Sequence, residues 1–183
     1  TEPLTLTTGL APDGDGVVIS CSGSSVAGTA PDADGPPRGA QMTFGWTSVS
    51  DCTGTLYTKV RKKITSAPYG TWTVTIESPS ADLYTYTAAT RTSAGVLENA
   101  TLELDGTGLS GTPASCSVQA TGTPGFAYSD SSAELSVGES SDSGSLFTVT
   151  SSSDCTASGT AVGDTVPIDA TYTLSRPIQI TSP

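Results

Sequence analysis

The chain has 183 residues, of which only 14% are charged, and its formal net charge is −11. This length suffices for one large β-domain or two small ones. The acidic balance argues against nucleic acid or an anionic membrane as the main partner. No run approaches the roughly 18 apolar residues of a membrane-spanning helix. The chain contains no histidine, which removes the usual general base near neutral pH and most zinc or copper sites. We therefore expect a non-enzymatic protein with no metal and no cofactor.

Short runs of alternating apolar and polar residues follow one another along the chain, and none has the spacing of an amphipathic helix. About twelve short strands at regular intervals are typical of an antiparallel β-sandwich, so the predicted fold class is all-β. A boundary is expected near residues 105–108, which gives β halves at 1–105 and 106–183, or one continuous sandwich domain. The predicted strands fall at 4–10, 17–21, 42–47, 56–60, 72–76, 83–87, 102–104, 116–120, 126–128, 135–137, 146–150 and 168–174, with a last one at 178–180. Residues 24–30 are a further candidate strand.

The sequence Ser-Asp-Cys-Thr occurs twice, at residues 50–53 and 153–156, each time after a strand-like run. Each copy has one further cysteine upstream, Cys21 for Cys52 and Cys116 for Cys155. Four cysteines allow three pairings, and the repeat favours Cys21–Cys52 and Cys116–Cys155. Each such disulfide would stabilise the fold by about 3–4 kcal/mol. Paired cysteines predict an oxidising compartment, so we expect a secreted or cell-surface protein, and the start at Thr1 rather than Met suggests a processed precursor.

The chain resembles a group of secreted Thr/Ser/Gly-rich proteins of actinobacteria, mostly without assigned function. The resemblance lies in the strand that ends in Asp-Cys-Thr, in its second-half copy, and in the terminal sequences at residues 170–174 and 177–181. It implies an exported two-disulfide β-protein and carries over no catalytic residue.

The first strand has Leu4, Leu6 and Leu10 on one face, with Thr8 on the same parity, and turn residues 12–16 separate it from the rest. Such a strand either completes its own sheet or is lent to a neighbouring subunit by strand addition. The sequence leaves both alternatives open.

Four of the seven basic residues, Lys59, Arg61, Lys62 and Lys63, lie within five positions. This cluster either docks on an acidic patch of another copy or on a cell-wall phosphate polymer, or it is a solvated strand end that protects a sheet edge. Asn99 begins a glycosylation sequon.

Two further sets of residues have a structural and a functional interpretation. Trp72, Tyr84, Tyr86 and Tyr57 are either core residues or a carbohydrate-stacking platform. Residues 13–16 and 32–35 share the Asp-x-Asp-Gly opening of calcium loops but lack the rest of that signature, so we interpret them as tight turns.

The leading hypothesis is a non-enzymatic extracellular structural or surface protein, a self-assembling fibre subunit linked by its N-terminal strand. The alternative is a secreted binding module, either a carbohydrate-binding adhesin or a protein inhibitor.

Overall fold

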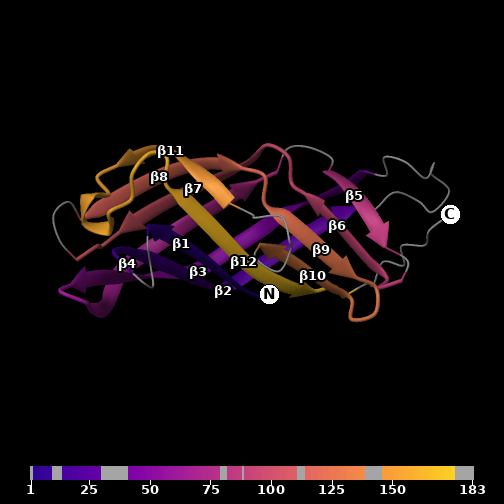
Figure 1. The fold of residues 1–183 in the computed structure, drawn as a ribbon, viewed down its shortest axis with the longest axis horizontal. Helices are drawn as coiled ribbons and strands as arrows, with labels where there is room; N and C mark the ends of the chain where they lie inside the picture. Colours follow the sequence, from indigo (N-terminus) through magenta and orange to yellow (C-terminus); the bar gives the residue numbers. More distant parts are fainter. Residues whose placement is uncertain are drawn as a thin grey trace.

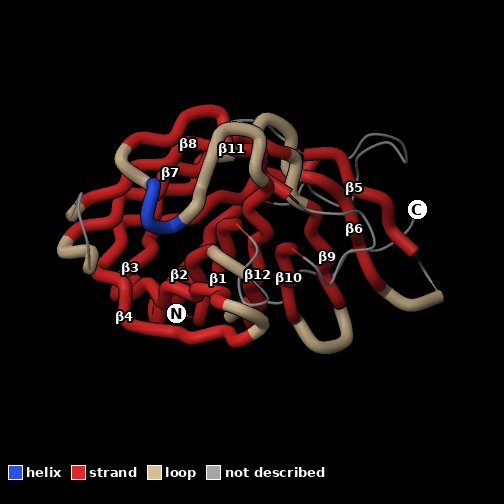
Figure 2. Tube along the Cα trace, turned by 60° about the vertical axis from the view of Figure 1, so that its left-hand side comes forward, coloured by secondary structure: helices blue, strands red, loops and turns tan. Residues whose placement is uncertain are grey.

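The computed structural model describes residues 2–9, 14–29, 41–78, 82–87, 89–110, 114–138 and 146–175. Within these ranges the chain forms antiparallel strands and one 3₁₀ turn, η1 (Thr156–Ser158), which is blue in Figure 2. The all-β prediction is confirmed. The predicted terminal strand at 178–180 lies outside the described residues. The strands are β1 (Glu2–Gly9), β2 (Gly16–Thr29), β3 (Gln41–Val60), β4 (Lys63–Glu77), β5 (Asp82–Thr87), β6 (Thr92–Val96), β7 (Ala100–Thr107), β8 (Ser115–Gly122), β9 (Gly125–Ser129), β10 (Glu134–Gly138), β11 (Leu146–Ser153) and β12 (Thr165–Thr173).

The strands form one sheet that closes on itself twice. The first ring runs β1-β2-β3-β4-β7-β8-β11-β12 and closes through the pairing of β12 with β1. The second ring shares β12, β1, β2 and β3 with the first, and continues from β3 through β5, β6, β9 and β10 back to β12. Ring closure removes the open edges that a flat sheet of this size would expose.

The rings separate where two long strands change partners. β12 pairs with β11 through residues 165–167 and with β10 through residues 169–173. β3, with 20 residues, pairs with β5 through residues 41–42 and with β4 from Cys52 onward. Figure 1 shows the result as an elongated body with β4, β7, β8 and β11 toward one end and β5, β6 and β9 toward the other.

Both rings take strands from both halves of the sequence. The boundary expected near residues 105–108 falls at the end of β7, which pairs with β4 on one side and β8 on the other. The chain therefore forms one continuous sheet across this position. A single apolar cluster fills it, with contributions from both rings.

The strands of the first ring show the expected alternation of buried and exposed residues. In β7 and β8 every second side chain is buried, which places their Leu, Val and Ala residues inside and their Thr, Ser, Glu and Gln residues outside. This period of two is what a closed sheet requires of a strand with one face in the core and one in solvent.

One row of paired residues runs around the first ring and contains both disulfides, which have the predicted connectivity. We call it the closure row. Its members are cross-strand partners in succession, except that the last step is the disulfide itself, and all are buried. The row is Ala170, Leu4, Cys21, Cys52, Trp72, Gly106, Cys116 and Cys155.

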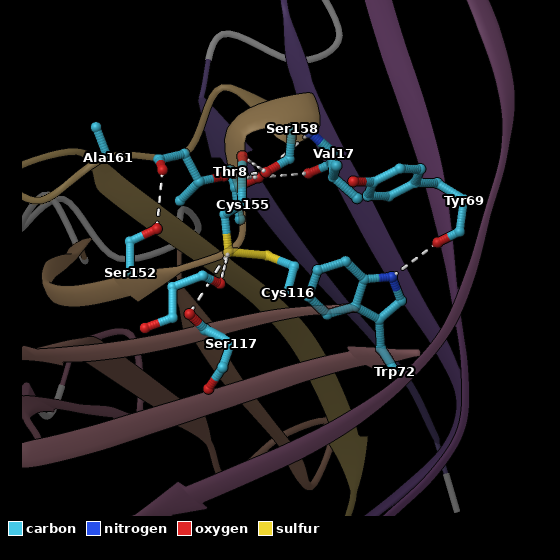
Figure 3. The surroundings of a disulfide bond; sticks show 12 residues. Thr8, Val17, Tyr69, Trp72, Cys116, Ser117, Ser152, Cys155, Ser158 and Ala161 are labelled. Atoms are coloured by element: carbon cyan, nitrogen blue, oxygen red, sulfur yellow. Dashed lines mark hydrogen bonds between the residues drawn. A yellow bond between two sulfur atoms is a disulfide. The ribbon is translucent and has the colours of Figure 1, made fainter. Parts of the chain in front are cut away.

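Trp72 occupies the middle of the closure row because two glycines leave room for its indole ring. A Cβ atom at Gly106 would lie 2.8 Å from Cζ2 of Trp72, and one at Gly54 would collide with the indole nitrogen. That nitrogen donates a hydrogen bond to the carbonyl oxygen of Tyr69 at 3.0 Å. Figure 3 shows the indole beside the Cys116–Cys155 disulfide. The ring is thus held between two strands and fixed at its polar atom.

The repeated Ser-Asp-Cys-Thr sequence has the same backbone signature in both copies. Asp51 has a φ of 53° and Asp154 a φ of 60°, the left-handed region that Asp tolerates better than most residues. The copies differ after the cysteine. β3 continues beyond Cys52 because β2 and β4 flank it, whereas β11 ends at Ser153 and Cys155 precedes η1. The two copies therefore share the positive φ of the aspartate, but only the second copy lies at a strand end, and the first lies inside β3.

β1 is held on both edges within its own subunit. Leu4 and Leu6 pair with Cys21 and Ile19 of β2 and with β12 on the other side, and both leucines have 0% exposure. Thr8, on the same face, is also buried. Its hydroxyl accepts a hydrogen bond from the Val17 amide at 3.2 Å and one from the Thr160 hydroxyl at 3.1 Å. Leu10 lies outside the described residues.

Tyr172 ties the long strands together in the second ring. Its hydroxyl accepts a hydrogen bond from the Trp46 indole at 2.8 Å and lies 2.9 Å from the Ser24 hydroxyl. Ser24 donates its own proton to the carbonyl oxygen of Glu2 at 2.7 Å, so Tyr172 is the donor to Ser24. Burial raises the pKa of Tyr172, which keeps the hydroxyl protonated and able to donate.

Substituting Gly106→Ala should lower the free energy of unfolding by about 1–3 kcal/mol, because the new methyl group must displace the Trp72 ring from a filled site. The matched control is Gly45→Ala in β3, where an added Cβ meets nothing within 4 Å. Urea unfolding measures both. Equal stability of the two variants would contradict the packing described for Trp72.

Candidate functional site

The clearest candidate site is the end of the β3–β4 hairpin. Val60 pairs with Lys63, so only Arg61 and Lys62 form the turn. Their φ angles of 47° and 69° are both positive, as in the type I′ turn of two-residue hairpins. We call residues 58–68 the basic hairpin.

The turn carries residues that its geometry does not favour. Type I′ turns prefer Asn-Gly, because both central positions need positive φ. A left-handed conformation costs an ordinary L-residue about 1–2 kcal/mol. Arg61 and Lys62 occupy the two central positions of the turn. The end of the hairpin is therefore positively charged, and the left-handed backbone of these two residues lowers the stability of the fold.

The basic hairpin is exposed on all sides. Every residue from 58 to 68 is exposed, which shows that neither face of this two-stranded ribbon is covered. On β4, pairing with β7 begins only at Thr71, so residues 63–68 have β3 as their one strand partner among the described residues. Figure 1 shows the hairpin at the end of the molecule where β4 begins.

Apolar side chains accompany the charges. Val60 is 60% exposed and Ile64 39% exposed, and these are two of the four large apolar side chains that are exposed in the described part of the chain. Val60 is the cross-strand partner of Lys63, and Ile64 is the partner of Lys59, so each face of the ribbon combines one apolar and one basic side chain.

The base of the hairpin is fixed to the body. The Lys59 amide donates a hydrogen bond to Oδ1 of Asp15 at 2.7 Å. Asp15 lies in the bend before β2, and residue 13 of the expected turn lies outside the described residues. Farther along the same two strands, Gly54 of β3 lies against Trp72 of the closure row. The basic hairpin is therefore an exposed ribbon on a rigid support.

Charge is strongly segregated between hairpin and body. The hairpin holds four of the seven basic residues and no acidic one, so the remaining three basic and 18 acidic residues sum to −15. Among the described residues, Arg61, Lys62 and Lys63 form no ion pair. Their charges are available to an acidic partner.

The other residues singled out in the sequence lie elsewhere. Trp72 is buried, so it cannot take part in an exposed stacking platform, and Tyr57, Tyr84 and Tyr86 are half-buried. Asn99 is exposed in the turn before β7. Residues 32–35 lie outside the described part.

Three further observations concern metal-type clusters, long apolar helices and the cysteines. In the described ranges, no three or more His, Cys, Asp or Glu side chains are grouped as a metal site requires. Among the same residues, no helix has the length and apolar content needed to cross a membrane. Both disulfides are formed and no cysteine is free, which fits a protein outside the cytoplasm.

Sequence reasoning found the four basic residues but not the hairpin that presents them. The sequence shows the lysines and Arg61 as a cluster. It does not predict the turn, because residues 61 and 62 are neither Gly nor Asn, the residues that usually indicate a two-residue hairpin. Comparison with known proteins found no match: no family model, curated protein or solved structure matches the chain.

Replacing the turn by Asn-Gly, with Arg61→Asn and Lys62→Gly, should raise the free energy of unfolding by about 1 kcal/mol or more. The control Arg61→Gln/Lys62→Gln removes the same charges but keeps side chains with unfavourable left-handed geometry, so its stability should stay within about 0.5 kcal/mol of the wild type. Denaturant unfolding distinguishes the two. An Asn-Gly variant no more stable than the control would show that the turn carries no strain.

Proposed function

We propose that this chain is a non-enzymatic extracellular structural or surface protein that associates with further copies of itself, and that the basic hairpin makes the contact. The observation that carries the proposal is the charge segregation: a rigidly based ribbon with four basic residues on a body whose other residues sum to −15. A positively charged hairpin on a negatively charged body favours a partner whose contact surface is negatively charged.

The stability of the body supports a structural role. Disulfides that enclose 31 and 39 residues lie in the same ring as Trp72 and stabilise the fold by about 3–4 kcal/mol each. The chain has neither a histidine nor a free thiol, which are the commonest general base and the most reactive nucleophile of enzymes.

The hairpin suits a folded protein partner better than nucleic acid. Val60 and Ile64 provide apolar area of the kind that protein interfaces bury. A long polyanion bound at the hairpin would also lie close to the acidic body. Wherever its charges come within about 8–10 Å of the acidic side chains, the body repels it at physiological salt.

Linkage by the hairpin replaces linkage by the N-terminal strand in this proposal. Lending β1 to another subunit would break its pairing with β2 and with β12 and would expose Leu4 and Leu6. It would also break the closure row at Leu4. The hairpin can make contact with no change in the fold.

The wild-type protein should associate at about 0.1 M salt and dissociate at about 1 M, because exposed ion pairs are screened at high ionic strength. The variant Arg61→Gln/Lys62→Gln/Lys63→Gln should associate at least about tenfold more weakly than the wild type, whereas Arg91→Gln, at the exposed β5–β6 turn, should associate like the wild type. Analytical ultracentrifugation over a range of concentrations and electron microscopy provide the measurement.

Two outcomes contradict the proposal. One is a wild-type protein that stays monomeric at every concentration and salt level. The other is a triple variant that associates as strongly as the wild type. Binding of a monomeric wild-type protein to an anionic cell-wall polymer would instead support the binding-module alternative.

A further inference from the structure

We infer that the basic hairpin of one copy docks on the outer face of β4 and β7 in the next copy. We call this face the acidic wall and define it by Glu77, Glu103 and Asp105. The inference rests on the proposed function and specifies which surface of a second copy receives the hairpin.

The three carboxylates of the acidic wall share one face of the sheet. Glu77 pairs with Thr101, and Glu103 and Asp105 pair with Thr75 and Thr73. Cross-strand partners point to the same side, so residues at alternate positions of β4 and β7 project together. All three acidic residues are exposed, and buried residues alternate with them.

No cation balances this face within the described structure. β7 and β8 contain no basic residue, and the outward neighbours of the carboxylates are Thr and Ser residues and Gln119. Gln119 donates a hydrogen bond to Oε1 of Glu103 at 3.1 Å. Glu77 and Asp105 form no hydrogen bond or ion pair with described side chains.

The two surfaces match in charge and chemical character. Three carboxylates on the acidic wall face three unpaired cations of the hairpin, Arg61, Lys62 and Lys63. Leu146, 41% exposed, lies at the start of β11, which joins the same wall through β8. It offers an apolar contact for the exposed Val60 or Ile64. Surfaces that match in both charge and apolar area favour a specific encounter.

A hairpin cannot reach the acidic wall of its own subunit. Both surfaces lie on the single strand β4, with Lys63 at its start and Thr73, the partner of Asp105, ten positions later. At about 3.3 Å per residue these positions are about 33 Å apart along a paired strand. The wall that receives the hairpin therefore belongs to another copy.

This arrangement produces an interface between two different surfaces. Each bound copy uses its hairpin on one neighbour and leaves its wall free for another. Such heterologous contacts either close into a ring or continue as an open chain. A linear or ring-shaped assembly follows from two surfaces on one strand.

Mixing two neutralised variants tests the inference. The hairpin-neutral variant is Arg61→Gln/Lys62→Gln/Lys63→Gln, and the wall-neutral variant is Glu77→Gln/Glu103→Gln/Asp105→Asn. Each alone should associate at least about tenfold more weakly than the wild type. Mixed together, they retain one intact hairpin and one intact wall, so they should form one-to-one complexes that do not grow. Sedimentation velocity and native mass spectrometry measure the sizes.

The control is Glu134→Gln/Asp169→Asn, which removes two exposed carboxylates from β10 and β12, outside the wall. It should assemble like the wild type, and circular dichroism should show all variants folded. A wall-neutral variant that assembles like the wild type would overturn the inference and leave self-association in place. A wild-type protein that never associates would overturn the proposed function, and the inference with it.

Discussion

Trp72 occupies the position on which the closed sheet depends. Its indole lies between Gly54 and Gly106, donates a hydrogen bond to the Tyr69 carbonyl, and belongs to the same row of paired residues as both disulfides. A chain with few large apolar residues gains little from core burial alone, so one large aromatic ring and two covalent links contribute a large share of the net stability. The row also includes Leu4, and it therefore connects the first strand to the last.

The closed sheet explains why the basic hairpin is the part available for contact. Ring closure pairs β1 on both sides and leaves few strand edges unpaired in the described structure. The first residues of β4 belong to the hairpin, which extends from this body, and the last residues of β4 form part of the acidic wall. The strand that holds Trp72 in the core thus bears both proposed contact surfaces, and the rigidity of the core fixes their separation. Arg61 and Lys62 place positive charge in a turn where Asn and Gly would make the fold more stable. At these two positions, the charge proposed for binding is therefore present at a cost in stability.

Many strands of this fold can be predicted from local sequence patterns, because the alternation of apolar and polar residues indicates which face of a strand is buried. The runs around Trp72, Leu102 and Val118 predict their strands, and the repeated Ser-Asp-Cys-Thr sequence predicts the disulfide pairing. Ring closure could not be predicted, since alternation does not say that β12 pairs with β1, β10 and β11 in different segments. The hairpin could not be predicted either. Its turn contains no Gly or Asn, and its strands have no buried face, so residues 63–68 lack the alternation of apolar and polar residues that indicates a strand. The acidic wall likewise depends on the β4–β7 register, which no local pattern reveals.

Hydrogen–deuterium exchange of the β1 amides tests the central claim most directly, that the sheet is closed within one subunit and that β1 belongs to its core. If β1 is held by β2 and β12, its amides should exchange only through global unfolding, with the same free energy as those of β7 and β8. Exchange of β1 through a low-energy local opening, while β7 and β8 stay protected, would contradict the account. It would show that the strand detaches from its own body and is free to pair with another copy.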